Sequence, residues 1–192
     1  MRFWKRNLAL LAALVMGLAG AAWAWRVTEQ ERQVQREIAG QVIRFHVLAN
    51  SDRRADQEIK NQVKERLLYS MEELLAYTDD LEETRACLTS ALPQLQEEAQ
   101  ETVREAGSGD IVTVELTTAE FPVKTYGDYT FPAGTYETLQ VEIGNGLGHN
   151  WWCLIYPSLC FEDALHPVMT EKGGKKLKNV LSDEAYDSIL QK

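Results

Sequence analysis

Hydrophobic and polar positions follow two different rhythms along the chain. In residues 41–49 they alternate, and apolar side chains at every second position predict a β-strand. In residues 59–75, and again in 79–106, apolar residues recur every three or four positions, as on an amphipathic helix. Residues 50–52, Asn-Ser-Asp, are expected to end the strand and cap the first helix. Pro93 predicts that the second helical region is kinked or divided in two.

From residue 111 onward the pattern becomes that of a β-sheet. Four segments with alternating or continuous apolar residues predict strands: 111–117, 121–126, 135–143 and 151–156. The order of strand, helix, helix and several strands predicts an α+β domain. We expect a mainly antiparallel sheet covered on one face by two or three helices. The C-terminal tail is polar and is predicted to end in a short helix.

Residues 144–161, GNGLGHNWWCLIYPSLCF, concentrate glycine, aromatic and cysteine residues. Glycines and an Asn-Gly pair adopt positive φ readily, so this segment is predicted to form a core hairpin with a glycine-rich turn. A second hypothesis, compatible with the first, is that the turn also presents a recognition surface for a partner protein. Its candidate binding residues are Gly148, His149, Asn150, Trp151 and Trp152.

The adjacent residues Trp151 and Trp152 cannot share one environment. Neighbouring side chains on a strand point to opposite faces of the sheet, so only one of them can fill the core beneath the helices. The other faces a second layer, the C-terminal tail or water. An exposed tryptophan beside a glycine turn is typical of a protein-binding anchor.

The N-terminus has the pattern of an export segment. Basic residues within 1–7 precede an uncharged run of leucine and alanine in 8–24, with small residues placed for cleavage by a signal peptidase. The run is also long enough to remain as a membrane anchor. In both cases the positive-inside rule places the chain from Arg26 onward outside the cytoplasm. Four parts follow: a signal peptide or anchor (1–24), a linker or polar helix (25–40), an α+β signalling domain (41–161) and a polar tail (162–192).

Charge limits the kinds of partner. The chain carries 20 basic and 29 acidic residues, a net charge of −9, and three of the basic residues belong to the export segment. Phosphate backbones and anionic lipid surfaces both require a basic surface. We therefore expect no nucleic-acid partner, and contact with a membrane only through the N-terminal segment.

Cys153 and Cys160 are a candidate disulfide, because thiols of exported chains tend to oxidise and the segment between them can close a small loop. The alternative is two buried free thiols, since cysteines on strand geometry do not always reach each other. Cys87 is interpreted as a small core residue of the second helix.

Recognisable catalytic spacing is missing from the sequence. The glycines of residues 144–148 precede a strand, whereas a dinucleotide-binding loop opens a helix. No histidine has a partner at the spacing of a zinc motif, so we expect no metal or cofactor. An exported hydrolase acting on peptidoglycan or peptide remains an alternative, and it would use His46, Asp52 and His149, brought together by the fold.

Several blocks of the chain together resemble one known family. They include VIRFHVLANSD in residues 42–52, Gln57 and Lys60 shortly after it, and GLGHNWWC in residues 146–153. On these motifs the segment 42–161 is similar to the stage II sporulation protein R family.

The resemblance implies a non-enzymatic intercellular signal. Members of this family are made in the forespore of endospore-forming bacteria and exported into the space between the forespore and mother-cell membranes. There they are needed to activate a membrane-embedded aspartic protease of the mother cell, which processes the precursor of sigma-E. The family has no accepted catalytic residues, so none are assigned here. A third hypothesis is a membrane-tethered structural protein that keeps its N-terminal segment as an anchor.

Overall fold

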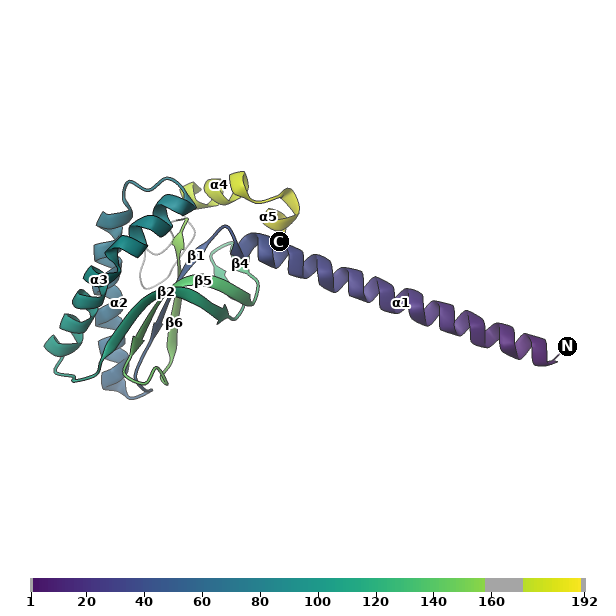
Figure 1. Cartoon of the computed structure of the whole chain (residues 1–192), viewed down its shortest axis with the longest axis horizontal. Coiled ribbons are helices and arrows are strands. Elements are labelled where there is room, and N and C mark those ends of the chain that lie inside the picture. The colour runs from purple at the N-terminus through teal and green to yellow at the C-terminus, as the bar shows by residue number, and fades with distance from the viewer. Residues whose placement is uncertain (1, 158–170, 191–192) are drawn as a thin grey trace.

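The computed structural model describes residues 2–157 and 171–190, with side chains from residue 14 onward. Its centre is a four-stranded mixed sheet (Figure 1). The strands follow the order β2 (Val112–Phe121), β5 (Gly134–Ile143), β1 (Ile43–Leu48) and β6 (Asn150–Tyr156). β1 is parallel to β5 and antiparallel to β6, and β2 is antiparallel to β5. The predicted α+β class with a mainly antiparallel sheet is confirmed.

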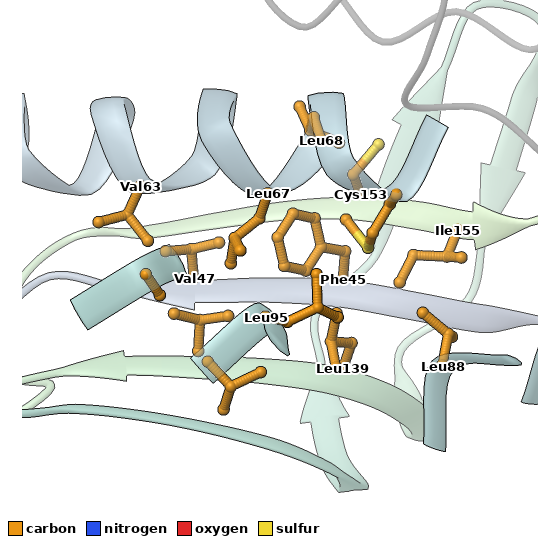
Figure 2. Packing of buried hydrophobic residues seen from close by; sticks show 14 of the residues in the cluster. Phe45, Val47, Val63, Leu67, Leu68, Leu88, Leu95, Leu139, Cys153 and Ile155 are labelled. Carbon is orange, nitrogen blue, oxygen red and sulfur yellow. The ribbon is translucent and has the colours of Figure 1, made fainter. Parts of the chain in front are cut away.

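Two long helices cover one face of this sheet, as the apolar periodicity predicted. They are α2 (Arg54–Leu75) and α3 (Leu81–Glu105), which continues as a single helix through Pro93. The Asp80 side chain caps α3 by accepting a hydrogen bond from the Glu83 N–H. Figure 2 shows apolar side chains of β1, β5 and β6 packed against those of α2 and α3. This is the first core.

The opposite face of the sheet is also covered, which is one of the alternatives that the sequence left open. A second core forms there beneath the end of α1 (Arg2–Ala39), the small hairpin of β3 (Lys124–Tyr126) and β4 (Tyr129–Phe131), and the helices α4 (Glu171–Val180) and α5 (Asp183–Ile189). Its buried apolar residues include Ile38, Phe121, Phe131, Tyr136, Leu177 and Ile189. The segment that the sequence assigned to a linker or polar helix and the tail with its short helix thus both contribute to this core.

Arg44 is the unexpected member of this second core. Its side chain is fully buried, and its guanidinium carbon lies 4.0 Å from the centre of the Phe121 ring and 4.7 Å from that of Tyr136. Nη2 donates a hydrogen bond of 3.0 Å to the Tyr126 hydroxyl. Stacking on aromatic faces partly compensates the guanidinium for the water it loses.

The predicted core hairpin is wrong. β5 and β6 are not paired, because β1 lies between them and pairs with both. Strands two positions apart are separated by about 10 Å, a distance that a six-residue connection spans easily. Residues 144–149 therefore pass over the end of β1 and do not form a tight hairpin turn.

The N-terminal part of α1 extends away from the domain (Figure 1). Among the residues that the structure describes, no helix contains an apolar stretch long enough to cross a membrane.

Candidate functional site

The two most distinctive motifs of the sequence meet at one end of the sheet. There the 144–149 loop packs on the 49–52 segment, which connects β1 to α2. The Gly148 N–H donates to the Ala49 carbonyl at 2.9 Å, and the Leu147 N–H donates to the Asn50 carbonyl at 3.3 Å. Main-chain bonds of this kind fix the path of the loop independently of its side chains.

Asn50 ties the first half of the loop to the same segment. Its side-chain oxygen accepts hydrogen bonds from the backbone N–H and the side-chain amide of Asn145, at 2.9 and 3.1 Å. Gly144 and Gly146 on either side both have φ of +62°, a conformation that L side chains rarely adopt. The glycines are needed for the turn, as predicted, although the turn joins strands that are not neighbours.

His149 and Asp52 form a surface pair at the end of the loop. Oδ1 of Asp52 accepts a hydrogen bond from the His149 N–H at 2.6 Å and lies 2.5 Å from Nδ1 of the ring. These bonds from the His149 side chain and backbone lower the pKa of Asp52. Asp52 therefore does not cap α2, whose N-cap residue Arg53 makes no side-chain capping bond.

Lys60 of α2 holds the 144–149 loop through a hydrogen bond to its backbone. Nζ donates to the His149 carbonyl at 3.0 Å and to the Gln57 side chain at 2.6 Å, and Gln57 in turn donates to the Ser51 carbonyl at 3.0 Å. Burial lowers the pKa of Lys60, and the positive charge of Lys64 lowers it further. Gln57 and Lys60 belong to the motifs quoted above, but only the fold shows what they hold.

Two aliphatic side chains project from this end of the sheet. Leu147, at the tip of the loop, is 80% exposed, and Ile111, just before β2, is 76% exposed. The Gly144 N–H donates to the Ile111 carbonyl at 2.8 Å, so the two segments lie together. Sequence reasoning missed both residues. A leucine between glycines in a turn was the available signal, because a tight turn has no interior in which to bury it.

The two tryptophans point to opposite faces, as predicted, and each packs into a core. Trp151 meets Phe45 edge-on in the first core, with ring centres 5.5 Å apart. Trp152 stacks on His46 at 3.6 Å and contacts Phe121 edge-on at 4.5 Å in the second core. Both side chains are half-buried. Trp152 is therefore covered by the second core, on the face of the sheet opposite α2 and α3.

His46 does not join Asp52 and His149. Only 5% of its surface is exposed, and neither of its ring nitrogens has a hydrogen-bond partner among the described residues. Burial lowers its pKa to about 4. The residues proposed for a hydrolase are therefore divided between a surface pair and a buried ring. No group of three or more His, Cys, Asp or Glu side chains able to hold a metal occurs in the described part of the chain.

Comparison with known proteins places the chain in a family. The family "Stage II sporulation protein R" matches residues 39–166. The chain belongs to this family. Stage II sporulation protein R of Bacillus subtilis (strain 168) is 35% identical over 184 residues, which are 95% of this chain and 80% of that protein. No solved structure matches.

The family match includes both halves of the site, the 49–52 segment and the 144–149 loop. It ends before α4 and α5, which complete the second core.

The cysteines are described in part. Cys153 is buried and disulfide-bonded, and Cys87 is a free thiol whose Sγ lies 3.2 Å from the Leu74 carbonyl. Cys160 lies outside the described residues, so its pairing with Cys153 stays a prediction.

Proposed function

We propose that this chain is an exported, non-enzymatic signalling protein of sporulation. It is made in the forespore, enters the space between the forespore and mother-cell membranes, and activates a membrane-embedded aspartic protease that processes the sigma-E precursor. Membership of the stage II sporulation protein R family supports the role in sporulation. The acidic composition and the N-terminal export pattern agree with action outside the cytoplasm.

The observation that carries the proposal is the 144–149 loop, with Leu147 exposed on a rigid support. A loop held by main-chain hydrogen bonds loses little conformational freedom when it binds. Leu147 and Ile111 are exposed aliphatic side chains at this end of the sheet, and the Asp52–His149 pair supplies polar groups in the segments that carry the loop. An apolar centre with a polar rim is the common arrangement of protein-binding surfaces.

The proposed contact residues are therefore the exposed ones of the loop and not the two tryptophans. Trp151 and Trp152 each fill part of a core, so truncating them would test folding as much as binding. The exposed residues at this end of the sheet include Leu147, Ile111, Asp52, His149 and Asn150. The hydrolase hypothesis loses its third residue, because His46 is buried beneath Trp152.

We expect Leu147→Ser to lower processing of the sigma-E precursor by about fivefold or more, since interface anchors contribute over 1 kcal/mol each. The measurement is the ratio of mature to precursor sigma-E in sporulating cells whose only copy of this protein is the variant. Tyr77→Ser is the control, because Tyr77 is an exposed side chain in the α2–α3 connection and lies outside the site. Unchanged processing with Leu147→Ser at normal protein level would remove this loop as the contact surface.

A further inference from the structure

β2 is an edge strand, and α3 caps only its first half (Figure 1). The Val112 N–H donates to the Gln100 side chain at 3.0 Å, and the Val114 N–H donates to the Gln96 side chain at 2.7 Å. The amide of Gln96 also donates to the Val112 carbonyl. These glutamines satisfy the outward backbone groups at the beginning of β2 and prevent another strand from pairing there.

The second half of β2 has no such cap. In an antiparallel ladder every second residue turns its N–H and C=O away from the neighbouring strand. The β2–β5 register is continuous, so the outward groups after Val112 and Val114 belong to Leu116, Thr118 and Glu120. Within the part of the chain that the structure describes, no hydrogen bond reaches the backbone of these three residues.

Part of the usual protection of an exposed edge is also missing. Natural edge strands carry charged side chains, above all lysine, or a proline or a bulge that discourages pairing, and residues 116–121 contain no lysine or proline. Residues 116–121 are Leu-Thr-Thr-Ala-Glu-Phe, a sequence compatible with pairing, and their register with β5 shows no irregularity. Thr118 and Glu120 are exposed, and Leu116 is half-buried against the first core.

Acidic side chains near the uncovered half of β2 determine which kind of segment could pair with it. Glu115 and Glu120 are exposed on β2, and Glu97 is exposed on α3. Arg85, the nearest cation of α3, already bonds the carboxylates of Glu82 and Glu137. A second copy of the chain, with its own net charge of −9, would be repelled. A segment with lysine or arginine would be attracted.

We propose that residues 116–121 of β2 accept an extended, basic segment of a partner protein as an additional strand of the sheet. Backbone hydrogen bonds to Leu116, Thr118 and Glu120 would hold the segment, and the surrounding carboxylates would select its charge. The inference rests on the proposed function in requiring a partner protein. It concerns a surface distinct from the 144–149 loop.

The first test uses the full chain and a synthetic peptide of about seven residues that alternates lysine with valine. Bound peptide is expected to slow amide hydrogen exchange at Leu116, Thr118 and Glu120 by about tenfold or more. The same peptide with glutamate in place of lysine is expected to leave exchange unchanged. N-methylation of alternate peptide amides, which removes the pairing donors, should abolish the protection. Equal protection by the acidic or the N-methylated peptide would overturn the proposal.

The matched variants are Thr118→Pro and Thr118→Ala. Both remove the threonine side chain, but only proline removes the outward N–H, and β5 does not use that N–H. We expect proline to weaken binding of the lysine–valine peptide about tenfold, and alanine to change it less than about threefold. Equal affinities of the two variants would contradict the inference. So would concentration-dependent dimerisation, measured by sedimentation, that Thr118→Pro abolishes, because the occupant would then be a second copy.

Failure of this inference can be distinguished from failure of the proposed function. If the edge binds no peptide while Leu147→Ser still lowers processing of the sigma-E precursor, the edge proposal is wrong and the signalling role stands. If cells lacking the chain process the precursor normally, the proposed function is wrong whatever the edge binds.

Discussion

Gly148 lies so close to the β1–α2 connection that no side chain fits. A Cβ at this position would come within 2.3 Å of the Ser51 carbonyl oxygen, which is a backbone atom and cannot move aside easily. The close approach lets the Gly148 N–H reach the Ala49 carbonyl and so fixes the loop that carries Leu147. The position of the exposed Leu147 thus depends on the close contact between Gly148 and Ser51.

Gly148→Ala is therefore expected to lower the free energy of unfolding by about 1–3 kcal/mol, through overpacking against Ser51. Urea unfolding measures the change. Gly109→Ala is the control, since nothing lies within 4 Å of a Cβ there, and its effect is expected to stay within about 0.5 kcal/mol. Equal stability of the two variants would show that the loop can move away from Ser51.

His46 makes stability depend on pH through its burial. Its pKa falls to about 4 in the folded protein, so on acidification the unfolded chain, whose histidine has its ordinary pKa near 6.5, takes up the proton first. The stabilisation is present above about pH 6.5 and is lost as the pH falls towards about 4, by roughly 3 kcal/mol in total.

The measurement for His46 is urea unfolding at about pH 7 and about pH 4. His46→Phe keeps an aromatic ring beneath Trp152 without a titrating group. We expect the parent chain to lose roughly 3 kcal/mol more than this variant between the two pH values. Carboxylates titrate in both proteins and cancel in the comparison. Parallel losses would mean that His46 is protonated while folded.

At the scale of elements, α1 serves two different purposes along its length. Residues 21–28 are exposed, whereas Ile38 is completely buried in the second core. Near its end the helix is bonded to the α4–α5 connection, where the Ser182 N–H and hydroxyl both donate to the Glu37 carboxylate. Cleavage of a signal peptide after Ala24 would leave these contacts intact.

We expect a chain without residues 1–24 to unfold cooperatively in urea, because the removed side chains that the structure describes pack against nothing in the domain. In that chain Ile38→Ala should cost about 2–5 kcal/mol, as is usual for a buried isoleucine. Val27→Ala, an aliphatic change on the exposed part of the same helix, should cost less than about 0.5 kcal/mol. A shortened chain without a cooperative transition would contradict this division of α1.

At the scale of the whole molecule, the sequence pattern predicted the residues of one buried face of the sheet but not those of the other. On the face covered by α2 and α3, β1 carries Ile43, Phe45 and Val47. These apolar residues alternate with polar ones along the strand, and this alternation predicted both the strand and the first core. On the other face β1 carries Arg44 and His46, which resemble solvent-facing residues. Both are buried, because aromatic rings from β2, β5 and β6 cover them.

The sequence by itself determined the α+β class, the two amphipathic helices, the glycine-dependent turn and the family. These follow from local periodicity, backbone preference and a contiguous motif, all of which act within a few residues. Tertiary structure alone decided that β1 enters between β5 and β6, that Asp52 meets His149, and that the 144–149 loop bonds both Ile111 and the 49–52 segment. Those outcomes depend on contacts between segments up to about a hundred residues apart, and no short-range pattern encodes which distant segment fills a given position.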